Sequence, residues 1–177
     1  NVFVTGKSVF GDMKDGLPET MLGQFILTDI VVKPEPYVKE PITVSRAAMA
    51  FRLTLTPFKF SLGSLTLEAD TLQFGFSGEL TALSEGWQLG LNGSLATATA
   101  EQVKSYWPEN LKPKARDWFT KNVKAGRLKD AILALRIAPG TEPFFHLDMA
   151  IEDATVRYAK DLPVASEAFG QFSIHDN

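Results

Sequence analysis

The chain has 177 residues, of which 45% are hydrophobic and 22% are charged, and its formal net charge is −3. This composition is typical of a folded globular chain, and the negative charge argues against a nucleic-acid binder whose affinity depends on neutralising phosphates. Cysteine is absent, which excludes disulfide frameworks, thiolate metal sites and cysteine nucleophiles. With only two histidines as well, we expect no enzyme activity, no cofactor and no metal site.

The ends of the chain indicate a segment of a larger protein. The chain begins with Asn1, without an initiator methionine, and it carries no signal-peptide pattern. No apolar run approaches the roughly 18 residues that a membrane helix needs.

Alternation of apolar and polar residues dominates most of the chain and predicts strands with one apolar face. It is clearest over residues 47–56, and Pro57 marks a break because proline cannot donate to a strand ladder. Further alternating runs follow at 58–62, 65–69, 72–76, 80–82 and 87–91.

Glycines punctuate these strands, and we predict tight turns or bulges at them. They are Gly63, Gly75, Gly78 and Gly86. Asn92-Gly93 fits either a hairpin turn or the interior of a bulged strand.

The rhythm breaks at residues 99–124, where we predict two short helices. Thr99 and Gln102 fit a capping box that starts the first helix, which should end by Trp107 because Pro108 follows. Pro113 suits the first turn of the second helix, and Gly126 its C-terminal stop. One face of that helix would carry Ala115, Trp118, Phe119, Asn122 and Val123.

Alternation then resumes at 131–137, 145–151, 154–158 and 169–174. Short connections between successive strands predict an antiparallel meander. We therefore predict a mainly β fold with a small α insertion: a curved, twisted antiparallel sheet, either an open U-shaped groove or sandwich-like, with a helical hairpin near 99–124. The chain would be one segment, with a β meander at 1–98, the hairpin at 99–126 and further strands at 127–177.

Few residues suggest chemistry. His146 and Asp148 would share a strand face as metal ligands would, but no third ligand is in sight and His175 lies near the chain end. Two carboxylate pairs are available, Glu68/Asp70, which a strand would place on one face, and Glu152/Asp153. Both are more typical of a solvated strand surface than of an acid–base pair.

Seven basic residues gather around the second predicted helix: Lys112, Lys114, Arg116, Lys121, Lys124, Arg127 and Lys129. They fit a solvated helix face, or a contact with anionic lipid headgroups or an acidic partner. For such a contact we select Lys114, Lys121 and Lys124. The aromatic residues Trp107, Trp118 and Phe119 fit helix packing better than a recognition surface.

Two passages carry a family resemblance. The first is Tyr106-Trp107-Pro108, followed by the proline-led helix with Arg116-Asp117-Trp118-Phe119 and then Asn122. The second comprises 151–158, Leu162-Pro163 and Gly170-Gln171-Phe172. Together they span roughly residues 87–176 and resemble the AsmA-like envelope proteins, in particular their YhdP-type branch.

The resemblance implies a periplasmic segment of a protein anchored in the inner membrane of a Gram-negative bacterium, with the anchor outside this segment. It also implies phospholipid transport between the two membranes, or outer-membrane homeostasis, with acyl chains on an apolar β groove and other envelope proteins as further partners. No catalytic residue is carried over. The alternative is a structural or protein-interaction scaffold. As groove lining we predict Leu65, Leu67, Leu72, Phe74, Phe76, Trp87, Leu89 and Leu91, unless these residues fill a closed core.

Overall fold

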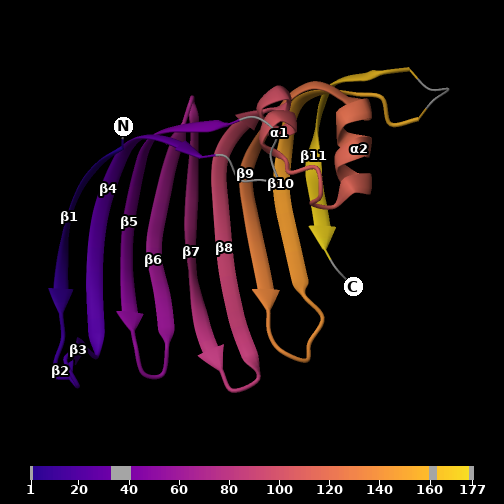
Figure 1. Cartoon of the computed structure of the whole chain (residues 1–177). Helices are drawn as coiled ribbons and strands as arrows, with labels where there is room; N and C mark the ends of the chain where they lie inside the picture. The colour runs from indigo at the N-terminus through magenta and orange to yellow at the C-terminus, as the bar shows by residue number, and fades with distance from the viewer. Residues whose placement is uncertain (1, 33–40, 160–162, 176–177) are drawn as a thin grey trace.

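A computed structural model describes residues 2–32, 41–159 and 163–175 and contains one large antiparallel sheet (Figure 1). Its nine strands follow the order β1-β4-β5-β6-β7-β8-β9-β10-β11, and β2 and β3 form a separate two-stranded ribbon. The strands are β1 (Phe3–Phe10), β2 (Met13–Lys14), β3 (Leu17–Pro18), β4 (Thr20–Val32), β5 (Ile42–Thr54), β6 (Lys59–Ala69), β7 (Leu72–Leu83), β8 (Gly86–Thr99), β9 (Val123–Ile137), β10 (Phe144–Val156) and β11 (Ala165–His175). The helices are α1 (Ala100–Tyr106) and α2 (Pro113–Asn122).

The sheet is a single open layer. The strands from β4 to β11 follow one another as a meander, and β1 and β11 are its two edges. Because these edges do not pair with each other, the sheet is not closed into a barrel. The mainly β fold with a helical hairpin is therefore confirmed, and of the two arrangements predicted for the sheet, the described residues form the open one.

The strand register separates an apolar face from a polar face. Residues paired across antiparallel strands point to the same side of a sheet. One row crosses all nine strands without a polar side chain: Gly6, Phe25, Met49, Leu65, Phe76, Gly93, Leu133, Leu147 and Ile174. We call this side the apolar face. On the opposite side, the polar face, a row reads Thr28, Arg46, Glu68 and Gln73.

The glycines are distributed differently from the prediction. Gly63 lies at a register shift between β6 and its neighbours, and Gly86 lies at the β7–β8 turn with φ +139°. Gly75 and Gly78, however, lie inside β7. A Cβ at Gly75 would come within 2.6 Å of the Ser94 hydroxyl oxygen, and one at Gly78 would meet the Gly90 carbonyl oxygen. Close approach of β8, and not a turn, explains these two glycines.

The Asn92-Gly93 pair lies within β8 and forms no hairpin turn. It pairs in regular register with Ser77 and Phe76 of β7. The Arg136 guanidinium donates to the Asn92 side-chain oxygen at 2.7 Å, so this asparagine serves as a cross-strand partner on the polar face.

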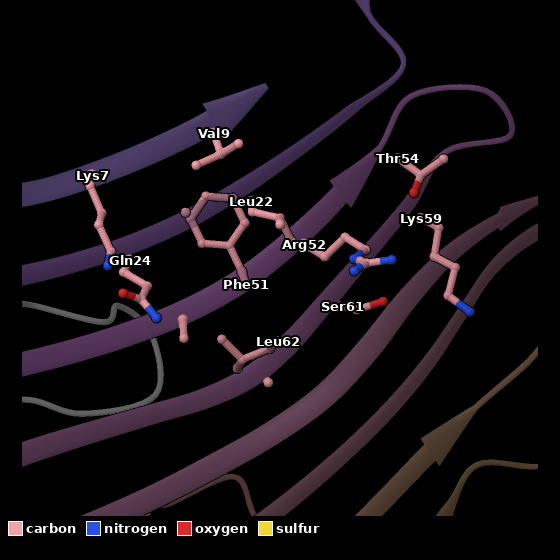
Figure 2. A pocket seen from close by; sticks show the side chains of 13 residues that line it. Lys7, Val9, Leu22, Gln24, Phe51, Arg52, Thr54, Lys59, Ser61 and Leu62 are labelled. Carbon is pink, nitrogen blue, oxygen red and sulfur yellow. The ribbon is translucent and has the colours of Figure 1, made fainter. Parts of the chain in front are cut away.

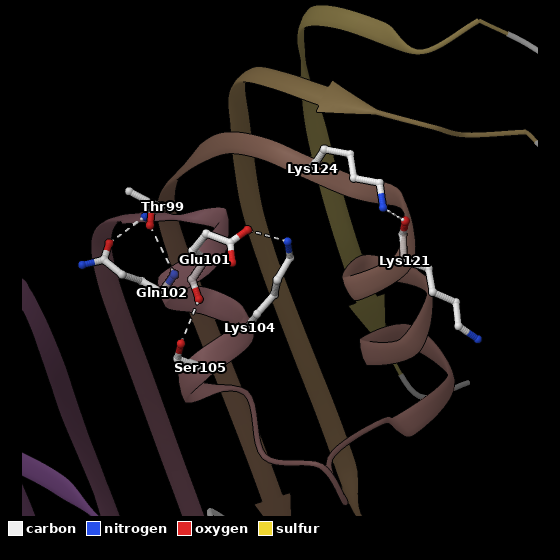
Figure 3. Close-up of polar contacts among 7 residues, drawn as sticks. All are labelled: Thr99, Glu101, Gln102, Lys104, Ser105, Lys121 and Lys124. Carbon is white, nitrogen blue, oxygen red and sulfur yellow. Dashed lines mark hydrogen bonds and ion pairs between the residues drawn. The ribbon is translucent and has the colours of Figure 1, made fainter. Parts of the chain in front are cut away.

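The first helix begins and ends as predicted. The Gln102 amide donates to the Thr99 hydroxyl at 3.2 Å and the Thr99 amide donates to the Gln102 side chain at 2.8 Å, which completes the capping box (Figure 3). Trp107 is the C-terminal cap, and its N–H donates to the Val103 carbonyl. Pro108 follows and prevents a further turn.

The second helix begins at Pro113 as predicted, but it ends at Asn122 and not near Gly126. Strand β9 starts directly at Val123, which is 1% exposed and pairs with Val156 of β10. Burial of this β-branched side chain in the sheet outweighs the glycine signal three residues later.

Two clusters of buried side chains stabilise the fold. The larger one lies between the helical hairpin and the neighbouring strands and contains Ala100, Trp107, Phe119, Val123, Leu128 and Met149. The smaller one contains Val44, Ala47 and Ala69, with Leu67, Phe74 and Tyr106 packed against it. The hairpin therefore covers one end of the apolar face near β8–β11 (Figure 1).

Candidate functional site

The register brings all eight predicted lining residues to the apolar face. Leu65 pairs with Phe76 and Leu67 with Phe74, while Leu72 closes the β6–β7 end opposite Ala69. On β8, Trp87, Leu89 and Leu91 face the same way, opposite Ala82, Leu80 and Gly78 of β7. Their contact with lipid stays a prediction.

These eight residues differ in exposure. Leu72 is 3% exposed and is therefore packed core, whereas Trp87 is 55% exposed at the opposite end of the sheet. The other six are half-buried. The open part of the apolar face therefore lies away from the helical hairpin, and Leu72 is poorly placed for any ligand.

The apolar face also carries aromatic residues that the sequence did not single out as lining. Phe25, Phe51 and Phe60 follow one another across β4, β5 and β6 with ring centroids 5.9 and 5.2 Å apart. Phe74 and Phe76 continue along β7, 6.4 Å apart. Phe51 and Phe60 belong to the period-two pattern of the sequence. What the sequence lacked was the strand register, which shows that these rings are neighbours on the apolar face.

A cavity of about 320 Å³ lies between the helical hairpin and strands β7–β10 on the apolar face. Phe76 and Leu133 form part of its floor, and Trp107 and Leu111 part of its helical side. The indole N–H of Trp107 donates to the Leu111 carbonyl at 2.8 Å, so this polar atom is already satisfied. Such a pocket suits an apolar chain better than a polar ligand.

Tyr106 also lines this cavity and links the hairpin to the sheet. Its ring lies 5.8 Å from that of Phe74, edge to face, and its hydroxyl donates to the Asp70 carboxylate at 2.9 Å. Burial raises the pKa of Tyr106, and the hydrogen bond and charge of Asp70 raise that pKa further. Asp70 lies at the β6–β7 turn with φ +52°, because β6 ends at Ala69. The prediction that Asp70 shares a strand face with Glu68 is therefore wrong.

A larger hollow of about 780 Å³ involves β1, β4, β5 and β6 (Figure 2). Its lining includes Lys7, Gln24, Arg52 and Lys59, whose strand positions belong to the polar face. Lys59 lies 2.8 Å from the Glu79 carboxylate, which satisfies one of these cations. None of the predicted lining residues contributes to this hollow.

His146 and Asp148 do share the polar face, as predicted, with the imidazole Nε2 2.6 Å from the Asp148 carboxylate. The register also pairs His175 with His146, a proximity that the sequence did not reveal. The hydrogen bond from Ser173, and to a smaller extent that from His146, lowers the pKa of Asp148. Within residues 2–32, 41–159 and 163–175, no three histidine or carboxylate side chains are arranged to hold a metal ion.

The second carboxylate pair considered in the sequence, Glu152 and Asp153, has structural partners. Glu152 lies 3.1 Å from the Lys129 ammonium, and Asp153 bonds to the Arg127 guanidinium. These exposed ion pairs join β9 to β10.

The basic cluster separates into engaged and exposed members. Arg116 donates to the Trp107 carbonyl at 3.0 Å, and the Lys112 ammonium lies 5.6 Å from the Phe145 ring centroid. The three lysines selected from the sequence are exposed: Lys114, Lys121 and Lys124. Lys124 donates to the main-chain oxygen of Lys121 at 2.6 Å (Figure 3).

The three aromatic residues of the hairpin do not all pack as predicted. Trp107 and Phe119 are 8% and 1% exposed and belong to the core, but Trp118 is 42% exposed. Its ring stacks on Phe172 of β11 at 6.4 Å, and the rest of its surface faces solvent. A helix on a sheet edge buries a narrower stripe than the predicted face.

Within the part of the chain that the structure describes, neither helix has the length and apolarity needed to cross a membrane. The search of curated proteins and that of solved structures found no match. A family model described as YhdP protein matches residues 14–177, which is most of the chain. The chain therefore belongs to the YhdP family, whose members are envelope proteins of the AsmA-like type.

Proposed function

We propose that this segment gives phospholipid acyl chains an apolar surface on which they move between the inner and outer membranes, without bond chemistry. The proposal places the chain in the periplasm, as part of a protein anchored in the inner membrane and involved in outer-membrane homeostasis. The observation that carries it is the uninterrupted apolar row from Gly6 on β1 to Ile174 on β11. The membership of the YhdP family supports it.

The energetics of the apolar face suit transport. Each methylene that leaves water gains about 0.8 kcal/mol, so a surface of leucine and phenylalanine side chains can hold an acyl chain without any specific contact. Neighbouring rows are chemically similar: one contains Phe25, Met49 and Leu65, and the next contains Phe51, Leu62 and Leu91. Similar neighbouring positions leave no deep trap, and a chain can therefore slide.

The cavity beneath the hairpin gives this surface a defined end. It receives contributions from four strands, from α1 and from the connection between the two helices, and its lining is almost entirely apolar. Phe74 and Phe76 lie on its boundary and also belong to the predicted lining. An acyl chain on β7 would therefore meet the cavity at the end of the sheet where α1 packs.

The second candidate function is an interaction scaffold. Both edge strands, β1 and β11, present unpaired backbone groups on their outer side within the described sheet. An exposed edge is a template for a strand of another chain. A scaffold of this kind would use the edges, whereas lipid transport would use the apolar face.

Photo-crosslinking in living Gram-negative cells tests the proposal. The probe replaces Leu89, which lies on the apolar face far from the hairpin, and its control replaces Gln88 on the polar face. Leu89 is a better position than Phe74, because the Phe74 ring already packs against Tyr106. We expect phospholipid adducts at Leu89 and none at Gln88.

Protein-only or intramolecular adducts at Leu89 would overturn the lipid proposal, because that side would then be a packed surface. Adducts to another protein at β1 or β11, with no lipid adduct at Leu89, would favour the scaffold. Equal lipid adducts at both positions would indicate indiscriminate labelling by the membrane and would also contradict the proposal.

A further inference from the structure

The outer side of α2 carries an exposed row of basic and aromatic side chains. Lys114, Trp118 and Lys121 are spaced by four and three residues, so they lie along one side of the helix. Lys124 follows just after the helix, and its ammonium reaches back to the Lys121 carbonyl at 2.6 Å (Figure 3). We call these four residues the α2 ridge.

The α2 ridge stands on a rigid base. Phe119, on the opposite side of the helix, is 1% exposed and packs with Trp107. The Trp118 ring stacks on Phe172 with an interplanar angle of 13°, which fixes the indole while 42% of the residue stays exposed. The ridge is therefore presented in one orientation.

A second exposed aromatic residue lies close to the ridge. The Arg157 amide donates to the Asn122 carbonyl at 2.9 Å, so the chain after β10 runs beside the end of α2. Tyr158, the next residue, is 57% exposed. Tryptophan and tyrosine combine an apolar body with a polar tip and favour the boundary between water and lipid.

The charges of α2 and of the neighbouring part of β10 leave the ridge positive, although the whole chain has a net charge of −3. The nearest acidic residues of β10, Glu152 and Asp153, bind Lys129 and Arg127. On α2 itself, Asp117 is the one acidic residue, against three lysines in the ridge. The local excess of positive charge is complementary to an anionic surface.

We propose that the α2 ridge docks on the headgroups of an anionic phospholipid bilayer. The lysines would contact phosphate groups, each contributing about fivefold in affinity near a negatively charged surface. Trp118 and Tyr158 would enter the headgroup layer. Exposed tryptophan and tyrosine side chains beside lysines are the combination that holds proteins at the headgroup level of a bilayer. This inference concerns the outer side of the hairpin and does not depend on lipid binding to the apolar face.

Vesicle sedimentation tests the docking. The purified protein is mixed with vesicles of phosphatidylglycerol and phosphatidylethanolamine, and with vesicles of phosphatidylcholine alone. We expect binding to the anionic vesicles only, weakening as salt rises. Lys121→Gln/Lys124→Gln should weaken this binding about 25-fold. Lys7→Gln/Lys14→Gln removes the same charge at the far end of the sheet and should leave binding unchanged.

Several results would overturn the docking. Equal loss in the two double variants would mean that only net charge matters, and equal binding to both vesicle types would mean that charge does not matter. Leu89→Asp separates this inference from the proposed function, because it should weaken acyl-chain binding on the apolar face and leave vesicle binding intact. Absence of vesicle binding together with salt-sensitive binding to an acidic envelope protein would replace the bilayer with that partner.

Discussion

The hydroxyl of Tyr106, the last residue of α1, donates a hydrogen bond of 2.9 Å to the carboxylate of Asp70 in the turn between β6 and β7. These residues are 36 positions apart. The bond joins the helical hairpin to strands that are not its immediate neighbours in the chain, and Tyr106 also packs against the smaller buried cluster. The hairpin is therefore tied to the middle of the sheet as well as to β8 and β9.

Tyr106→Phe should lower the free energy of unfolding by about 1–2 kcal/mol, because it removes one hydrogen bond to a charged group and leaves the ring in place. Tyr158→Phe is the matched control, since Tyr158 is 57% exposed and its hydroxyl should contribute less than about 0.5 kcal/mol. Urea unfolding of the two variants measures the difference. Equal effects would mean that the bond to Asp70 adds nothing.

Phe119 and Trp118 are neighbours in the chain with opposite roles. Phe119→Ala should lower the free energy of unfolding by about 3–5 kcal/mol, because it opens a cavity beneath α2. Trp118→Ala loses a stacking contact with Phe172 but leaves no cavity, so we expect about 1 kcal/mol. Urea unfolding measures both, and a larger loss for Trp118→Ala would contradict the assignment of Phe119 to the core.

The pKa of Asp148 should make stability depend on pH in acid. Hydrogen bonds from Ser173 and His146 hold this pKa below its ordinary value of 3.8 in the folded protein. The resulting stability is therefore fully present above pH 3.8 and is lost as the pH falls through the folded pKa. Asp148→Asn should be less stable than the native protein at pH 7, and the difference should shrink towards pH 2.

Unfolding by urea at several pH values measures this dependence. Ser173→Ala removes the largest cause of the shift and should move the acid loss to higher pH. A constant difference between the native protein and Asp148→Asn from pH 7 to pH 2 would show that the carboxylate is not responsible.

Local patterns predicted the elements whose signals are contained within a few residues. The Thr99–Gln102 capping box, the stop before Pro108 and the start at Pro113 are all confirmed, because each depends on backbone groups within one helical turn. The period-two pattern likewise predicted a common side for Phe74 and Leu89. The sequence could not decide whether a second layer covers that side, because apolar and polar residues alternate in the same way along the strands of open and closed sheets.

Contacts between distant residues were beyond these patterns. His175 lies opposite His146 only because β11 pairs with β10 in this register. Phe25 belongs to the aromatic series only because β4 lies beside β5. The exposure of Trp118 depends on where α2 crosses the sheet edge, which helical spacing does not specify.

Gly126 shows how one residue can satisfy two patterns, and it provides the last prediction. It fits a helix stop, but it lies inside β9 with φ +139°, and a Cβ there would come within 2.9 Å of the Ala154 Cα atom. Ala154 is fully buried, so neither strand can move away easily. Gly126→Ala should therefore lower the free energy of unfolding by about 2 kcal/mol or more.

Gly170→Ala on β11 is the control for this substitution, because no atom lies within 4 Å of a Cβ at that position. We expect it to change stability by less than about 0.5 kcal/mol. Circular dichroism distinguishes the two roles of Gly126. Loss of a helix stop would lengthen α2 and raise the helical signal. Strain between β9 and β10 would instead lower the unfolding midpoint and leave the helical signal unchanged. A stable Gly126→Ala protein with more helix would contradict the strand assignment.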